Sequence, residues 1–139
     1  MKRVTGLGGV FFKTKDPKKI RAWYSKHLGL PIDEYGASFR WIDLNDKEAK
    51  VPALTSWSPF KEDTAYFQPS EKQFMFNYRV ANLVELLQAL KEEGVQVVGE
   101  IEETPYGKFG WIMDPEGNKI ELWEPNDVEY SKVKGGVTK

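Results

Sequence analysis

Two stretches of the chain share one order of apolar and polar positions: a strand pattern, a helix pattern and a glycine. In the first stretch, residues 8–15 (GGVFFKTK) predict a strand, and Asp16 and Pro17 supply a helix N-cap and a first helical position. The glycine that ends this helix is Gly29. Between these signals, a face at helical spacing is formed by Ile20, Trp23, Tyr24 and His27.

The second stretch repeats this order after a long interval. Residues 73–80 (QFMFNYRV) predict a strand, Asn82 is the N-cap, and Gly94 ends the helix. Asn82 follows Asp16 by 66 residues. The apolar face of this helix consists of Leu83, Leu86, Leu87 and Leu90.

Further strand patterns follow each helix. They lie at residues 31–35, 38–44 and 50–57 in the first half, and at 95–101, 108–113 and 119–124 in the second. We therefore predict an α+β fold made of two β-α-β-β-β modules in a single domain, 1–139. The modules span about 6–57 and 74–125, the segment 58–73 links them, and the tail 126–139, which lacks periodicity, is expected to be flexible.

The linker 58–73 is unusually aromatic. Phe60, Tyr66 and Phe67 lie in it, and Trp57 comes directly before it. Exposing these rings together would be unfavourable, so we expect the segment to pack across another part of the molecule. It is either a lid over a ligand cavity or a loop that covers an open end of the sheet.

Residues 106–125 (YGKFGWIMDPEGNKIELWEP) predict a hairpin with a carboxylate in its second strand. Residues 114–117 (DPEG) have the composition of a type I turn. In the strand that follows, Ile120 and Leu122 fall on one face, and Glu121 shares the other face with Trp123. Glu121 is therefore the carboxylate whose role matters most for function.

Composition limits the function classes. The chain of 139 residues has no cysteine, which excludes disulfides and zinc-thiolate sites, and its formal net charge of -1 argues against general nucleic-acid binding. No stretch approaches the roughly 18 apolar residues of a membrane-spanning helix. We expect a cytoplasmic protein that neither spans a membrane nor binds nucleic acid.

The two modules, the segment WYSKHLGL after the Asp-Pro helix start, and the closing hairpin together resemble the vicinal oxygen chelate superfamily. This superfamily includes glyoxalase I, bleomycin-resistance proteins and extradiol dioxygenases, and the resemblance covers about residues 6–125. It implies that the modules pair into a curved half-barrel sheet with helices on the outer face. It also implies a binding cavity on the concave side and a homodimer.

Metal-dependent members of this superfamily carry one ligand on each of four concave strands. The matching positions here are Gly9, Ala53, Met75 and Glu121. Glycine and alanine offer no ligand atom, and a thioether suits the divalent ions of these enzymes poorly. His27, the only histidine, is expected to be structural. The resemblance thus predicts no bound metal and no cofactor, with a divalent metal as the alternative.

Alternation along the strands from these aligned positions predicts the lining of the cavity. The expected ligand-binding residues are Phe11, Lys13, Thr55, Met75, Asn77, Arg79, Glu121 and Trp123. Aromatic rings with a few polar groups are typical of a small-molecule pocket, although the same residues could fill the half-barrel as core. The pattern does not fix which face Trp41 and Trp111 occupy.

Three interpretations of function remain open at this stage. The first is a metal-independent protein of the bleomycin-resistance type that binds an aromatic or amphipathic small molecule. The second is a glyoxalase-like lyase or isomerase, or a dioxygenase-like enzyme, that uses a divalent metal or has Glu121 as its base and sole catalytic candidate. The third is an interaction module whose barrel is filled. Glu121 could contact a cationic ligand, act as a base, or be held by Asn77, Arg79 or Lys13.

Overall fold

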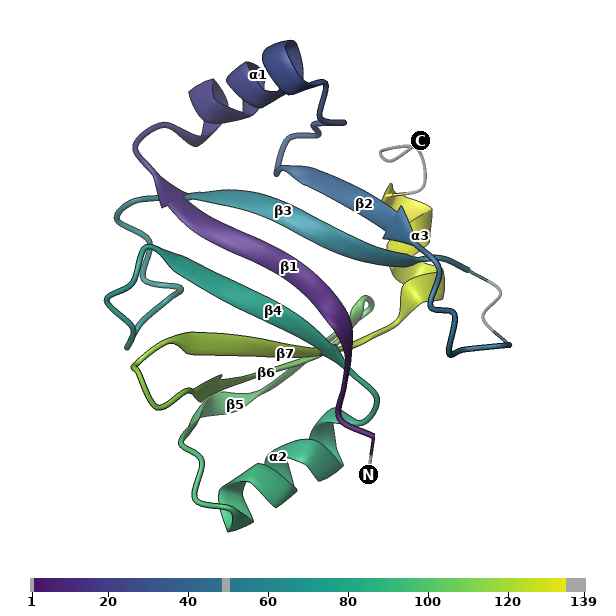
Figure 1. Cartoon of the computed structure of the whole chain (residues 1–139). Helices are drawn as coiled ribbons and strands as arrows, with labels where there is room; N and C mark the ends of the chain where they lie inside the picture. The colour runs from purple at the N-terminus through teal and green to yellow at the C-terminus, as the bar shows by residue number, and fades with distance from the viewer. Residues whose placement is uncertain (1, 49–50, 135–139) are drawn as a thin grey trace.

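The computed structural model describes residues 2–48 and 51–134, which form one curved, unclosed sheet with three helices (Figure 1). The strands are β1 (Val4–Thr14), β2 (Ala37–Trp41), β3 (Ala53–Lys61), β4 (Phe74–Val80), β5 (Val97–Thr104), β6 (Gly107–Met113) and β7 (Lys119–Pro125). The helices are α1 (Pro17–Leu28), α2 (Leu83–Glu92) and α3 (Asp127–Lys134). In this described part, no helix has both the length and the apolar run that crossing a bilayer requires.

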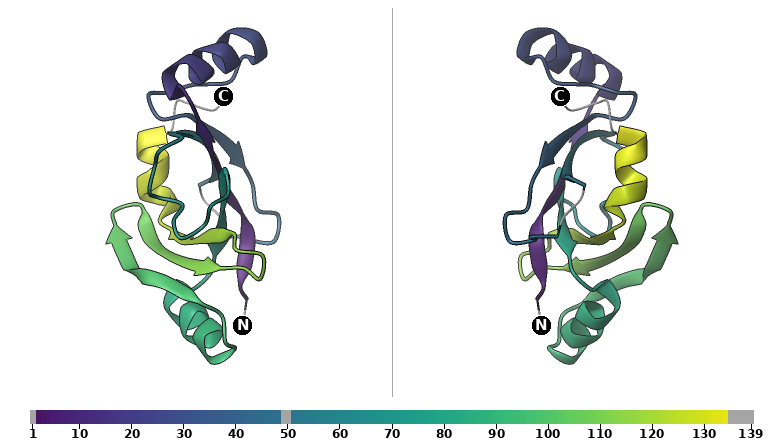
Figure 2. Two further views of the ribbon diagram at one scale, coloured as in Figure 1. Left: turned by 90° about the vertical axis from the view of Figure 1, so that its left-hand side faces the viewer. Right: turned by 90° about the vertical axis from the view of Figure 1, so that its right-hand side faces the viewer.

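The strand order β2-β3-β1-β4-β7-β6-β5 confirms the predicted pairing of two modules. The first strands of the modules, β1 and β4, lie side by side and antiparallel at the middle of the sheet. Each has a parallel neighbour from its own module, β3 beside β1 and β7 beside β4. The sheet curves into an arch, as the two side views show (Figure 2). The α+β half-barrel fold expected from the sequence is therefore present.

The first module differs from the prediction between its helix and its second strand. Residues 31–35 form no strand of the sheet, and only a single bridge joins Ile32 to Ala37. The carboxylate of Asp33 instead accepts hydrogen bonds from the backbone N–H groups of Tyr35, at 2.8 Å, and Gly36, at 2.9 Å. This side-chain turn competes with strand pairing, so the module is β-α-β-β.

The strand predicted at 50–57 is also displaced. β3 begins at Ala53 and continues to Lys61, four residues into the predicted linker. Its extension pairs with β1 through the register Lys13 to Phe60 and Thr14 to Lys61. Lys50, at the start of the predicted strand, lies outside the described residues.

Helix α2 forms as predicted and closes the core of the second module. The Asn82 side chain accepts from the N–H of Glu85 at 3.2 Å, which caps the helix. Three of its predicted leucines are buried against Val80 and Leu122 on the convex face of the sheet, and Leu90 packs partly buried beside them.

Helix α1 has the predicted caps but a different environment. Asp16 accepts from the N–H of Lys19 at 3.0 Å, and Gly29 takes the left-handed conformation at the end. No residue of α1 is buried, and its main ring contact with the sheet joins Tyr24 to Trp57 at 4.8 Å. His27 is exposed and packs on Trp23, with ring centroids 4.9 Å apart.

The tail contains an unpredicted helix, α3, on the concave side of the arch (Figure 2). The side chain of Asn126 accepts from the N–H of Glu129 at 3.2 Å and caps it. Ion pairing and hydrogen bonding with distant strands, described below, hold the helix in place. Such contacts leave no periodic pattern in the sequence, which is why no helix at 127–134 was expected from the sequence. Residues 135–139 lie outside the described part.

Candidate functional site

A cavity of about 240 Å³ opens on the concave side of the sheet. Strands of both modules, the linker loop and α3 all contribute to it. Its lining residues are Gly8, Phe11, Ser56, Ser58, Phe60, Tyr66, Asn77, Tyr106, Phe109, Glu121, Trp123 and Tyr130. Seven of these twelve residues are aromatic, and Glu121 is the one that can carry a full charge at neutral pH.

Glu121 lies at the base of this cavity and is only 2% exposed. Its Oε1 accepts from Nδ2 of Asn77 at 2.6 Å, and its Oε2 accepts from Nε1 of Trp111 at 2.9 Å and from the Tyr66 hydroxyl. Asn77 and Trp111 are its register partners on the neighbouring strands β4 and β6. The strand pairing therefore brings two of the three donors to the carboxylate, and the linker loop brings the third.

Burial has the largest effect on the pKa of the Glu121 carboxyl group. It raises the pKa of Glu121, and the hydrogen bonds from Tyr66, Trp111 and Asn77 only partly offset this effect. Burial and the neighbouring carboxylate also raise the pKa of Tyr66, which stays a phenol that donates its proton.

Lys119 supplies the nearest cation. Its Nζ donates to the carbonyl oxygen of Tyr66 at 2.7 Å and lies over the rings of Tyr66 and Trp111, 5.3 and 5.6 Å from their centroids. Burial lowers the pKa of this ammonium, while the charge of Glu121 opposes the shift. The carboxylate is thus surrounded by hydrogen-bond donors and one cation.

These surroundings do not fit a divalent cation. A metal site needs several lone pairs that converge, whereas Glu121 is met by the hydrogens of an amide, an indole and a phenol. Among the described residues, no group of three or more His, Cys, Asp or Glu side chains could hold a metal ion. The donor set matches a carboxylate that is held in place by the protein.

The residue beside Glu121 on β4 is not the one that the resemblance implies. Asn77 rather than Met75 lies beside it on β4, and Met75 is fully buried in the cluster with Phe67. Gly9 pairs with Asn77 on the other side, as the register shows. At Gly8, a Cβ would collide with Oδ1 of Asn77, so this glycine leaves the space that the amide occupies.

Stacked rings form the walls of the cavity. Phe109 and Trp123 lie parallel with centroids 5.8 Å apart, and Phe60 and Tyr66 lie parallel at 5.7 Å. Tyr130 meets Trp123 edge to face at 5.1 Å. The space between these rings suits a flat, apolar group.

The structure brings four of the eight predicted ligand-binding residues to the cavity: Phe11, Asn77, Glu121 and Trp123. Thr55 does not line it, because Gly9 pairs with Ser56 and places Ser56 and Ser58 on the cavity side of β3. The Thr55 hydroxyl instead donates to the carbonyl of Leu7 at 2.6 Å. The expectation that Ala53 and Thr55 share the face of Glu121 was wrong by one residue of register.

The other three predicted residues lie nearby without lining the cavity. Met75 is buried beneath it, and Lys13 lies over the ring of Phe67 at 5.6 Å. Arg79 is buried between the rings of Trp41 and Trp123, 5.4 and 5.2 Å from their centroids. None of these three side chains is among the residues that line the cavity.

Several lining residues were missed by sequence reasoning. Phe60 and Tyr66 belong to the aromatic segment whose packing was predicted without a role for either ring. The segment for which a lid and a covering loop were both open contains, in the described structure, a loop that places Phe67 in the core and Tyr66 on Glu121. Phe109 could have been found, since it pairs with Trp123 across the predicted hairpin. Tyr130 gave no signal, because it lies in the aperiodic tail.

Two polar contacts fasten α3 over the cavity. Nη2 of Arg79 donates to Asp127 in an ion pair, while Nη1 donates to the carbonyl of Leu54 at 3.1 Å. One turn further on, the hydroxyls of Tyr130 and Ser56 are 2.7 Å apart. The helix therefore closes one side of the cavity through contacts with β3 and β4.

We expect Asp127→Asn to loosen α3. The change removes the anionic partner of a buried guanidinium, and charge-assisted hydrogen bonds contribute about 1.5–3 kcal/mol. Amide hydrogen exchange in 127–134 should therefore accelerate by roughly tenfold or more. The control is Glu129→Gln, which breaks an exposed ion pair with Lys132 on the same helix and should leave exchange nearly unchanged. Equal rates in wild type and Asp127→Asn would show that Arg79 does not hold the helix.

Paired modules around one curved sheet, with a cavity on the concave side, define the half-barrel class of fold to which this structure belongs. The model of the Glyoxalase/Bleomycin resistance protein/Dioxygenase superfamily matches residues 6–122. The chain therefore belongs to this superfamily.

Solved structures agree with this assignment at the level of the fold. Methylmalonyl-CoA epimerase from Mycobacterium tuberculosis aligns with a TM-score of 0.59 and 21% identity, covering 92% of this chain and 93% of that one. A superfamily member from Vibrio splendidus 12B01 aligns with a TM-score of 0.53 and 13% identity, covering 85% and 98%. No curated protein matches the chain. At these identities the likeness shows the fold alone.

Proposed function

We propose that this chain is a metal-independent binding protein for a small aromatic or amphipathic molecule, which it holds in the concave cavity. The observation that carries the proposal is the lining of that cavity: seven aromatic rings around a space whose one formal charge belongs to Glu121. Rings supply affinity for flat apolar groups, and the few polar groups fix orientation. The protein is further proposed to be cytoplasmic and homodimeric.

The size of the cavity limits the ligand. At about 240 Å³ it is smaller than the roughly 300–1,000 Å³ of pockets for drug-sized ligands. The stacked pairs Phe109–Trp123 and Phe60–Tyr66 leave a slot between rings rather than a round space. A ligand with one or two fused rings fits this geometry better than a long flexible chain.

The state of Glu121 favours binding over catalysis. A general base must present a lone pair to its substrate, but both oxygens of Glu121 already accept hydrogen bonds and the residue is almost completely buried. We infer that Glu121 shapes the cavity by fixing Tyr66, Asn77 and Trp111. It also adds negative potential that favours a cationic ring over a neutral one.

Quenching of tryptophan fluorescence tests this proposal, because Trp123 lines the cavity. The probes are a flat cation, N-methylquinolinium, and a neutral molecule of similar shape, 2-naphthol. Both should quench in the presence of EDTA, and the cation should bind more tightly. Glu121→Gln should lower the affinity for the cation more than the affinity for the neutral probe, since only the cation is attracted by the charge of the carboxylate.

A variant that fills the cavity provides the matched control. Ser58→Leu should lower the affinity for both probes by roughly tenfold or more, because the added methyl groups occupy the space between the rings. Ser25→Leu makes the same change on the exposed side of α1 and should have no effect. Binding that EDTA abolishes and Ni²⁺ or Zn²⁺ restores would overturn metal independence. Equal affinity in Ser58→Leu and wild type would overturn the site.

A further inference from the structure

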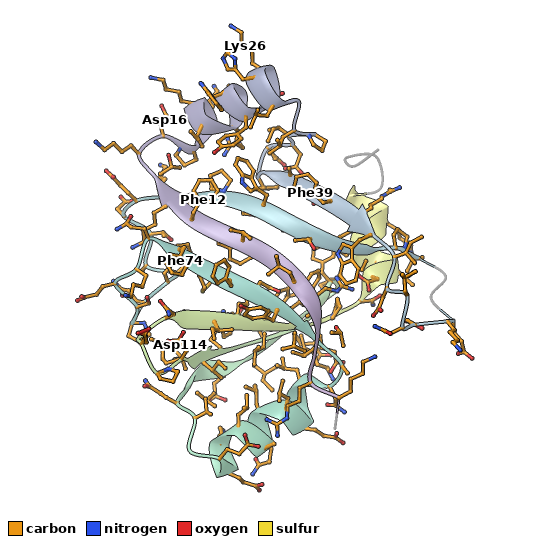
Figure 3. The ribbon with its side chains drawn as sticks, in the orientation of Figure 1. Phe12, Asp16, Lys26, Phe39, Phe74 and Asp114 are labelled. Atoms are coloured by element: carbon orange, nitrogen blue, oxygen red, sulfur yellow. The ribbon has the colours of Figure 1, made fainter. Side chains whose placement is uncertain are left out.

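The β3 side of the concave cavity carries neutral hydroxyl groups. Ser56 and Ser58 both line the cavity, because alternation along β3 turns Trp57, which lies between them, to the other face of the sheet. There the ring centroid of Trp57 is 5.2 Å from that of Phe12, which Figure 3 shows on β1. The two serines, which we call the β3 hydroxyls, therefore face a molecule that is held between the stacked rings.

The polar groups on the opposite side of the cavity already bind one another. Both oxygens of Glu121 accept hydrogen bonds, from Asn77, Trp111 and Tyr66. The oxygen of the Asn77 amide is turned towards Gly8, where a Cβ would lie 2.0 Å from it. Glu121 and Asn77 are each only 2% exposed. They therefore offer a ligand little access for hydrogen bonds and act on it mainly through charge and shape.

The β3 hydroxyls differ from each other in what they already contact. Oγ of Ser56 and the hydroxyl of Tyr130 are 2.7 Å apart, so each has a hydrogen-bond partner without a ligand. Among the side chains that the structure describes, none forms a hydrogen bond with the half-buried Ser58 hydroxyl. Tyr106 also lines the cavity, but it is 38% exposed and more open to water. Ser58 is thus the hydroxyl that gains most from a ligand atom, since a polar group without a partner is costly once water has left.

We propose that the ligand is a flat ring with a neutral oxygen substituent, a hydroxyl or a carbonyl, and that the Ser58 hydroxyl forms a hydrogen bond with this oxygen. The inference rests on the proposed ligand-binding function and adds the class of ligand and the residue that selects it. An uncharged oxygen suits the site because Ser58 is neutral and Glu121 disfavours an anionic group.

Aromatic side chains surround Ser58 on its side of the cavity. Register pairs it with Phe11 on β1, and the ring of Phe11 lies 5.5 Å from that of Phe60. Both rings line the cavity, so a ligand ring that packs on them brings its edge to the hydroxyl. In these surroundings a ligand that lacks the oxygen leaves Ser58 without a partner, which is how a binding site distinguishes such analogues.

The strand order separates this contact from the carboxylate. Two strands, β1 and β4, lie between β3, which carries Ser58, and β7, which carries Glu121. The oxygen at one end of the ligand and a positive charge at the other can therefore be accommodated together. The cavity then selects for orientation as well as for shape.

A double-mutant cycle removes the hydroxyl from the protein and from the ligand in turn. Equilibrium dialysis measures the affinity of wild type and Ser58→Ala for 2-naphthol and for 2-methylnaphthalene, which has a methyl group in place of the hydroxyl. Ser58→Ala should lower the affinity for 2-naphthol roughly fivefold, as expected for one net hydrogen bond, and should change that for 2-methylnaphthalene less than about twofold. Ser25→Ala, the same change at an exposed site on α1, should affect neither probe.

The outcomes separate this contact from ligand binding itself. If the ratio of the two affinities is the same in wild type and Ser58→Ala, the Ser58 contact is overturned while the binding function stands. If the ratio changes in Ser56→Ala but not in Ser58→Ala, the oxygen lies at the Ser56–Tyr130 pair and the assignment to Ser58 is wrong. If neither probe binds to the wild type, the ligand class and the proposed function both fall. Far-UV circular dichroism checks that the variants fold.

Discussion

We expect Phe67→Ala to lower the free energy of unfolding by about 3–5 kcal/mol, the range for removing a buried phenylalanine ring. Phe67 is fully buried although it lies in the loop between β3 and β4. It packs with Phe11, Met75 and Trp111, and its ring centroid is 5.3 Å from that of Phe60. The truncation would leave a cavity directly beneath the candidate site.

Urea denaturation monitored by circular dichroism measures this change. Phe39→Ala, a truncation of a phenylalanine that is 43% exposed, is the control and should cost about 1 kcal/mol or less. The truncation of Phe67 should also disturb the neighbouring Tyr66, because the same loop holds the Tyr66 hydroxyl against Glu121. A cost for Phe67→Ala that equals the control would mean that the loop does not contribute to the core.

The features that the sequence predicted well are those encoded within a few residues. The turn at 114–117 forms with a hydrogen bond from the N–H of Gly117 to the carbonyl of Asp114 at 3.2 Å. α2 follows from its cap and the spacing of its leucines. Each of these depends on local turn chemistry or on one amphipathic face, so the sequence alone contains the information.

The parts that could not be predicted depend on pairing between distant segments. β1 contains two irregularities, between Val4 and Gly6 and between Leu7 and Gly9, which shift its register against β4. Such shifts exchange the two faces of a strand, and nothing in the local pattern marks them. A displacement of one residue on β3 was enough to replace Thr55 by Ser56 in the cavity.

The role of Glu121 illustrates the same limit. Its position in an apolar strand was visible in the sequence, and Asn77 was among the partners considered. Trp111 was not assigned to a face, and Tyr66 comes from a loop. Only the assembled sheet shows that three donors from β4, β6 and the loop converge on this one carboxylate.

We expect the buried carboxylate of Glu121 to make the stability of the protein depend on pH in the opposite sense to an ordinary salt-bridged acid. Burial raises its pKa in the folded state above the unfolded value of 4.5. The folded state therefore binds the proton more tightly, and its stability is fully present below that unfolded value. As the pH rises through the folded pKa, this contribution is lost, at about 1.4 kcal/mol for each unit of pKa difference.

Comparison with Glu121→Gln isolates this contribution from the other titrating groups. The free energy of unfolding, measured by denaturation from about pH 4 to about pH 8, should fall with pH in the wild type relative to the variant. Glu116→Gln removes an exposed carboxylate of the turn and should keep the wild-type slope. Parallel curves for wild type and Glu121→Gln would mean that the three donors and Lys119 balance burial, so that Glu121 has the same pKa in the folded and unfolded states. A steeper fall in the wild type would instead place a neutral carboxylic acid at the base of the cavity at mildly acidic pH, where the preference for a cationic ring should disappear.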